Sequence, residues 1–132
     1  MKTKIIKQSI NIDTSPHEIF EAFMDSKKHA ELVSSTAKIS REAGGEFRIY
    51  DSYITGKNIE IIPDKKIVQL WRAEEECWPK EHFSTISLDL EAEGAGTKIN
   101  FTQTNVPEDC YDDIYKGWYD FYWDPLKEMF KK

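Results

Sequence analysis

The sequence predicts an α+β fold in which a curved antiparallel sheet of about six to seven strands wraps a long C-terminal helix. Apolar residues alternate with period two through much of residues 36–104, and short Gly- or Pro-containing turns separate the alternating runs. A single amphipathic helical pattern then covers roughly residues 108–130. Because strands joined by short turns form a meander with one face to cover, we expect this helix to cover it.

The N-terminal part predicts one strand followed by two short helices. Three alternating isoleucines are typical of a strand over residues 4–12: Ile6, Ile10 and Ile12. Ser15 is placed to cap a helix that begins at Pro16, and Glu18 completes the capping-box pattern. A second short helix is expected to follow Asp25 or Ser26.

The middle of the chain predicts the rest of the sheet. Its alternating apolar residues are Ala37, Ile39, Phe47, Ile49, Ile59, Ile61, Val68, Leu70, Ile86, Leu88, Leu90, Ile99 and Phe101. Turn residues occupy positions 43–45, 63–65 and 94–96, so consecutive strands are expected to pair as hairpins.

The C-terminal helix is expected to bury one broad apolar stripe. Its members follow three-and-four spacing: Tyr111, Ile114, Tyr115, Trp118, Tyr122, Leu126, Met129 and Phe130. Gly117 costs about 1 kcal/mol relative to Ala in a helix, which predicts a close backbone contact at that position. Pro125 cannot donate a backbone hydrogen bond to Phe121 and predicts a kink.

Length and composition indicate one domain over residues 1–132. The net charge of −6 argues against nucleic-acid binding. Cys77 and Cys110 lie far apart without CxxC spacing, so neither a disulfide framework nor a zinc site is predicted, and no metal or cofactor is expected. No apolar run is long enough for a membrane span, and no apolar signal region follows Met1, so we expect a cytoplasmic protein.

Several irregular, aromatic-rich motifs resemble one family. They are 44–47 (GGEF), 54–58 (ITGKN), 67–72 (IVQLWR), 78–88 (WPKEHFSTISL), 105–107 (NVP), 117–118 (GW) and 122–127 (YWDPLK). Together with the element order, they resemble the activators of heat-shock-protein-90 ATPase, in the START-like (SRPBCC) helix-grip superfamily, and in particular their C-terminal domain. The resemblance implies a role near a chaperone or in the stress response. The eukaryotic activators also carry an N-terminal domain that contacts the chaperone; since these 132 residues leave no room for it, we expect this chain alone not to stimulate the ATPase.

A cavity between the sheet and the helix is predicted from inward positions. Its expected aromatic wall is Trp71, Phe101, Trp118 and Tyr122, although aromatic residues on an inward stripe also serve simply to fill a core. Gln103 continues the face of Ile99 and Phe101, and Asp51 continues that of Phe47 and Ile49. Both are therefore candidate polar anchors for a ligand, Gln103 before Asp51, with a strand end in water as the alternative.

No catalytic pair is evident in the sequence. His17, His29 and His82 are expected in surface or structural roles, and three adjacent glutamates, residues 74–76, would raise rather than lower the pKa of a Cys77 thiol. Trp78 lies in a loop and either forms part of a cavity lid, contacts a partner protein or packs against its own domain. We therefore expect a non-enzymatic domain that binds a lipophilic small molecule; a co-chaperone-like protein-interaction module is the alternative, and a cyclase- or dehydratase-type enzyme comes third.

Overall fold

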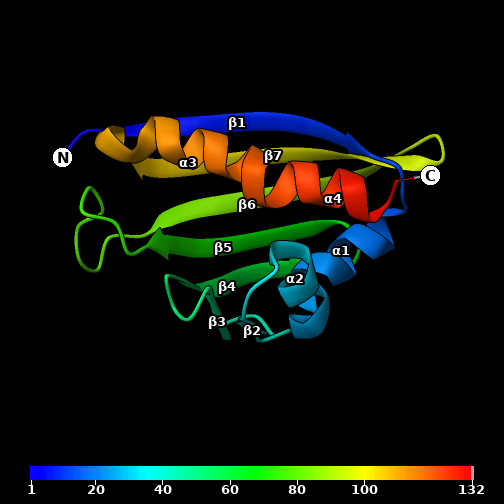
Figure 1. The fold of residues 1–132 in the computed structure, drawn as a ribbon, viewed down its shortest axis with the longest axis horizontal. Helices are drawn as coiled ribbons and strands as arrows, with labels where there is room; N and C mark the ends of the chain where they lie inside the picture. Colours follow the sequence, from blue (N-terminus) through cyan, green and yellow to red (C-terminus); the bar gives the residue numbers. More distant parts are fainter. Residues whose placement is uncertain (132) are drawn as a thin grey trace.

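A seven-stranded antiparallel sheet forms the frame of the protein in the computed structural model, which describes residues 1–131 (Figure 1). The strands are β1 (Thr3–Ile12), β2 (Ala37–Ile39), β3 (Glu46–Ile49), β4 (Ile54–Ile62), β5 (Lys66–Ala73), β6 (Ser84–Glu93) and β7 (Gly96–Pro107). Their order across the sheet is β1-β7-β6-β5-β4-β3-β2, so the first strand pairs with the last and the others form the predicted meander. Lys132 lies outside the described residues.

Two short helices connect β1 to β2, as the sequence predicts. The Ser15 side chain accepts a hydrogen bond from the backbone N–H of Glu18 at 3.3 Å and so caps α1 (Pro16–Met24). Asp25 caps α2 (Ser26–Val33) by accepting from the N–H of Lys28 at 2.9 Å. Both helices lie near one end of the sheet, beside the C-terminal end of the long helix (Figure 1).

The C-terminal helical segment lies over one face of the sheet (Figure 1). Its hydrogen-bonding pattern changes before Pro125. It consists of a 3₁₀ turn η1 (Glu108–Cys110), α3 (Tyr111–Trp118), a π-turn η2 (Tyr119–Trp123) and α4 (Asp124–Met129). The N–H of Asp124 donates to the carbonyl of Tyr119, five residues back. Pro125 has no N–H to continue the regular ladder, and this wider turn ends just before it. The kink of the helix axis at Pro125 stays a prediction.

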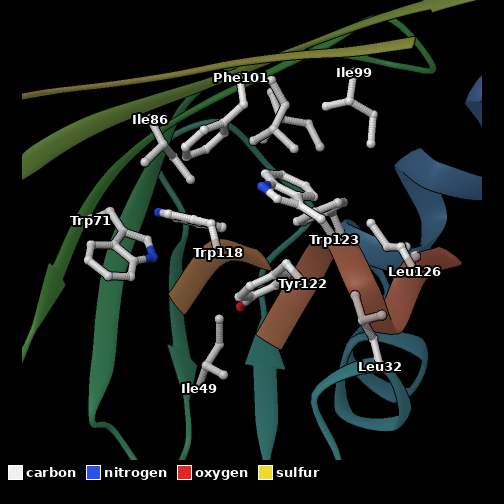
Figure 2. Close-up of a cluster of buried hydrophobic side chains, with 14 of the residues drawn as sticks. Leu32, Ile49, Trp71, Ile86, Ile99, Phe101, Trp118, Tyr122, Trp123 and Leu126 are labelled. Carbon is white, nitrogen blue, oxygen red and sulfur yellow. The ribbon is translucent and has the colours of Figure 1, made fainter. Parts of the chain in front are cut away.

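The buried stripe of this helix differs from the predicted one at several positions. Trp118, Tyr122 and Leu126 are buried as expected, whereas Tyr115 is 36% exposed and Met129 is 40% exposed. Trp123, absent from the predicted stripe, is fully buried against the sheet (Figure 2). A π-turn holds more residues per turn than an α-turn, so two adjacent residues can reach the buried side.

Two strands also depart from the predicted alternation. The pairing of β4 with β5 shifts register between Asn58 and Glu60, which leaves Ile59 exposed although it was expected inside. In β5 the buried set has the opposite parity to Val68 and Leu70, and comprises Ile67, Gln69, Trp71 and Ala73. Within residues 1–131, no helix is long and apolar enough to cross a membrane.

Candidate ligand-binding pocket

A pocket of about 580 Å³ lies between the long helix and the ends of β4 and β5. Its lining comes from the turn before β4 (Tyr50, Tyr53), from β4 and β5 (Ile54, Trp71, Ala73), from the following loop (Glu75), and from the helix (Asp113, Ile114, Gly117, Trp118, Phe121, Tyr122). Half of these side chains are aromatic. This composition is typical of a site for an apolar ligand with few polar anchors.

The inner wall consists of three buried aromatic residues from the predicted set (Figure 2). The ring centroid of Trp118 lies 5.6 Å from that of Trp71 and 4.8 Å from that of Tyr122. Trp71, Trp118 and Tyr122 are thus brought together from β5 and the long helix, as expected. Packing on several sides holds their rings in place, so the wall exists before any ligand arrives.

Phe101 and Gln103 do not line the pocket but support Trp118 from behind. The ring of Phe101 lies 4.4 Å from that of Trp118, between it and the sheet. Gln103 is fully buried; its side-chain oxygen accepts from Nε1 of Trp118 at 2.8 Å, and its nitrogen donates to Oγ of Ser84 at 2.9 Å. The inward parity of Gln103 is confirmed, but with these hydrogen bonds made it positions the indole rather than facing the cavity.

Gln8 supports the helix in the same way, although its role was not predicted from the sequence. Its side-chain oxygen accepts from Nε1 of Trp123 at 2.7 Å, and its nitrogen donates to the carbonyl of Tyr115 at 3.0 Å. Gln8 shares the buried parity of Ile6 and Ile10 on β1, which was the available signal. Two inward glutamines therefore orient the two buried indoles of the helix.

Tyr122 is fixed by a buried histidine. The carbonyl of Phe23 can only accept, so Nδ1 of His29 donates to it at 3.1 Å, and Nε2 accepts from the hydroxyl of Tyr122 at 2.8 Å. Burial lowers the pKa of His29 from 6.5 to about 4, and the bond to the Phe23 carbonyl offsets this only in part. His29 is therefore structural and neutral, and a structural role was one of the two roles predicted for it.

Acid should destabilise the protein through His29. The unfolded chain takes up this proton below pH 6.5 and the folded chain only near pH 4, so stability is full above pH 6.5 and falls as the pH drops. The loss reaches about 3 kcal/mol at pH 4. Urea unfolding at several pH values measures the free energy of unfolding as a function of pH. Between pH 6.5 and 5 this free energy should fall steeply in the wild type and less steeply in His29→Gln. His17→Gln, at an exposed position, should keep the steep fall; equal slopes in all three proteins would contradict the assignment.

The turn before β4 holds two tyrosines at the pocket in an unusual backbone conformation. Tyr50, Asp51 and Ser52 have φ values of 56°, 53° and 73°, a left-handed run of residues other than glycine. The hydroxyl oxygen of Tyr50 is buried without a hydrogen-bond partner, and burial raises the pKa of this phenol. Asp51 does not line the pocket; it is exposed beyond the end of β3 at Ile49, which is the strand-end alternative. Its carboxylate accepts from the Thr36 hydroxyl at 3.1 Å.

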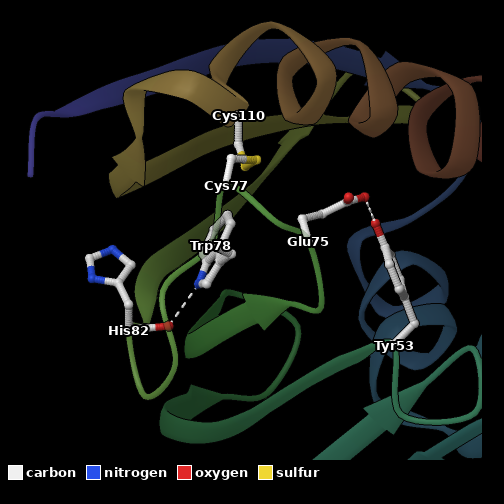
Figure 3. Close-up of a disulfide and its surroundings, with 6 residues drawn as sticks. All are labelled: Tyr53, Glu75, Cys77, Trp78, His82 and Cys110. Atoms are coloured by element: carbon white, nitrogen blue, oxygen red, sulfur yellow. Dashed lines mark hydrogen bonds between the residues drawn. A yellow bond between two sulfur atoms is a disulfide. The ribbon is translucent and has the colours of Figure 1, made fainter.

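Two exposed carboxylates, Glu75 and Asp113, form part of the pocket rim. The hydroxyl of Tyr53 donates to Glu75 (Figure 3). The pKa of Tyr53 is raised, first by burial, then by its bond to Glu75 and the charge of Glu75, and last by the charge of Asp113. Both carboxylates therefore raise the pKa of the same hydroxyl at the rim, although Glu75 comes from a loop and Asp113 from the helix.

A disulfide between Cys77 and Cys110 joins these two parts of the rim, which corrects the sequence-based expectation (Figure 3). The Cα atoms are 5.7 Å apart, although the residues are separated by 33 positions. Sequence spacing could not reveal the pair, because the fold brings the loop after β5 beside η1.

Trp78 packs against its own domain: it is buried, its ring lies 5.5 Å from that of Trp71, and its Nε1 donates to the carbonyl of His82 at 2.7 Å.

Gly117 leaves space rather than allowing a close backbone contact. A Cβ at this position would lie 3.8 Å from Cδ2 of Phe121, its nearest neighbour, which is an ordinary van der Waals distance. The space over Gly117 belongs to the pocket. The predicted contact is therefore wrong, and the glycine widens the cavity at the helix surface.

The pocket lining contains neither His nor Cys. His17 lies on the surface, with Nδ1 2.9 Å from a carboxylate oxygen of Asp64, and Nε2 of His82 lies 2.8 Å from the carbonyl of Asn105. Within residues 1–131, no group of three or more His, Cys, Asp or Glu side chains is arranged to hold a metal ion.

Sequence comparison relates the chain to proteins described as activators of the 90 kDa heat shock protein ATPase. It is 26% identical over 117 residues to the human activator of 90 kDa heat shock protein ATPase homolog 1, covering 89% of this chain and 34% of that protein. It is 29% identical over 129 residues to the Dictyostelium discoideum activator of 90 kDa heat shock protein ATPase homolog, covering 97% of this chain and 33% of that one. The chain thus spans about a third of the length of these relatives.

Solved structures share the fold along nearly the whole chain. An HSP90 activator from Plasmodium falciparum superposes with a TM-score of 0.88 at 22% identity, covering 95% of this chain and 94% of that one. The Aha1 dimer from Colwellia psychrerythraea gives a TM-score of 0.79 at 22% identity, with coverages of 97% and 96%. The family model described as "Activator of Hsp90 ATPase homolog 1-like protein" matches residues 13–131. The chain therefore belongs to this family, with the START-like helix-grip fold that its sequence predicts.

Proposed function

We propose that this chain is a non-enzymatic START-like domain that binds a lipophilic small molecule in the pocket between the sheet and the C-terminal helix. The observation that supports the proposal most directly is the pocket itself, at about 580 Å³ with six aromatic side chains in its lining. This volume lies within the range of small-molecule sites. Gln103 and His29 fix the inner wall, so a ligand would find Trp118 and Tyr122 already oriented.

Filling the space over Gly117 should abolish binding without unfolding the protein. Gly117→Leu places a side chain in the pocket, and Leu favours a helix over Gly by roughly 0.8 kcal/mol. Gly117→Ala is the matched control, because it adds only the Cβ. The probe is 4-phenylbenzyl alcohol, a neutral apolar molecule, and the signal is quenching of the fluorescence of Trp71 and Trp118.

Wild type and Gly117→Ala should both bind the probe, and Gly117→Leu should bind it at least about tenfold more weakly while remaining folded by circular dichroism. Thermal unfolding provides a second readout, since a saturating ligand stabilises by about 2.7 kcal/mol at a hundredfold excess over its Kd. If Gly117→Leu bound the probe as tightly as wild type, the pocket would not be the binding site.

A second candidate function is that of a co-chaperone-like module that binds a chaperone. The names of the relatives support it, because they describe activators of the 90 kDa heat shock protein ATPase. Because this chain alone is not expected to stimulate the ATPase, the test is direct binding of that chaperone by the 132-residue chain and by its Gly117→Leu variant. Binding by both would favour a chaperone-binding role that does not use the pocket.

A further inference from the structure

We infer that the ligand of this pocket is a cationic lipophile, an organic amine or ammonium ion attached to an aromatic or alkyl body. The inference rests on the proposed function and adds the charge and placement of the ligand's polar group. The body would occupy the aromatic interior, and the cationic group would lie at the rim between Glu75 and Asp113.

The charge of the lining is the first observation. Among residues 1–131, the only ionisable groups in the lining besides tyrosine are the two carboxylates, with no Lys, Arg or His. Within residues 1–131 neither carboxylate takes part in a salt bridge, whereas the nearby Glu74 and Asp120 are paired with Arg72 and Lys116. The rim thus carries two exposed negative charges without a basic partner among the described residues, at the mouth of an apolar cavity.

The aromatic walls are the second observation. The faces of Trp, Tyr and Phe rings attract cations, and they do so more strongly where water is partly excluded. Tyr50, Tyr53 and Phe121 extend the aromatic lining from the buried indoles towards the exposed rim. A ligand could therefore keep its cation in favourable contact while its apolar body is buried. An anionic ligand would meet repulsion from the same groups.

The buried hydroxyl of Tyr50 is the third observation. It lines the pocket but has no hydrogen-bond partner within the described residues. An unpaired buried hydroxyl is costly, so it offers a hydrogen bond to a polar atom of the ligand. Burial raises the pKa of this phenol, so it stays neutral and can both donate and accept.

Three probes of one shape test the inference: 4-phenylbenzylamine, 4-phenylbenzyl alcohol and 4-phenylbenzoate. At neutral pH and low salt, the amine should bind about tenfold more tightly than the alcohol, and the carboxylate more weakly than either. High salt should reduce the advantage of the amine, because the carboxylates are exposed and their charges are screened.

The variant Glu75→Gln/Asp113→Asn removes both rim charges with little change of shape. It should weaken the amine about tenfold and leave the alcohol unchanged. Glu76→Gln/Asp112→Asn is the matched control: both residues are exposed neighbours outside the lining, and the change in net charge is the same. This control should retain the preference for the amine.

The outcomes separate the inference from the proposed function. Tight binding of the alcohol with no preference for the amine, or a preference that both double variants lose equally, would overturn the inference and leave the pocket as a lipophile site. Preferential binding of the carboxylate would overturn it as well. If wild type bound none of the three probes, the proposed function would fail and the inference with it.

Discussion

Trp118→Ala should lower the free energy of unfolding by about 3–5 kcal/mol, as large-to-small substitutions in protein cores do. The indole is 3% exposed, and its ring lies against those of Phe101, Trp71 and Tyr122. The substitution also leaves the side-chain oxygen of Gln103 without its donor in a fully buried place. Urea unfolding of both proteins measures the difference.

Phe121→Ala is the control for that experiment. Phe121 lies three positions further along the same helical segment and also lines the pocket, but it is 54% exposed. Its truncation should cost less than about 1 kcal/mol, because little buried area is lost. If the two substitutions had similar small effects, Trp118 would not be part of the core, and the helix would not be held against the sheet as described.

The sequence predicted the architecture because its strongest signals are periodic. Alternation with period two predicted strands and three-and-four spacing predicted the last helix, and these elements were confirmed. Parity within a strand was less certain. Ile59 is exposed at a bulge after Asn58, and the buried side of β5 carries Trp71 rather than Val68 and Leu70.

The sequence predicted the inner aromatic wall of the candidate site but not its rim. Trp71, Trp118 and Tyr122 lie together at the pocket because inward positions converge under the helix. Glu75 and Tyr53 could not be assigned to it, since they belong to a loop and a turn whose paths are set by tertiary contacts and by no period. The left-handed backbone of residues 50–52 could not be predicted either, because none of these residues is a glycine.

Removal of the disulfide should have the second large effect on stability. A cross-link that closes a loop of 33 residues restricts the unfolded chain and contributes roughly 3–4 kcal/mol on chain-entropy grounds. Cys77→Ser/Cys110→Ser should therefore unfold at a lower urea concentration than the oxidised wild type. Adding a reductant should bring wild type close to the variant and leave the variant itself unchanged. Equal midpoints for wild type and variant without reductant, together with two titratable thiols in wild type, would show that the bond does not form.

The same variant also tests whether the cross-link organises the pocket rim. Glu75 lies shortly before Cys77, and Asp113 shortly after Cys110, so the disulfide fixes the distance between the two segments that carry the rim carboxylates. Without it, the loop is free to move away from the helix, and the two charges no longer converge on Tyr53. The variant should therefore bind 4-phenylbenzylamine more weakly, while 4-phenylbenzyl alcohol, held by the aromatic wall of Trp71 and Trp118, should be less affected. An equal loss for both probes would indicate that the cross-link supports the whole pocket rather than its rim.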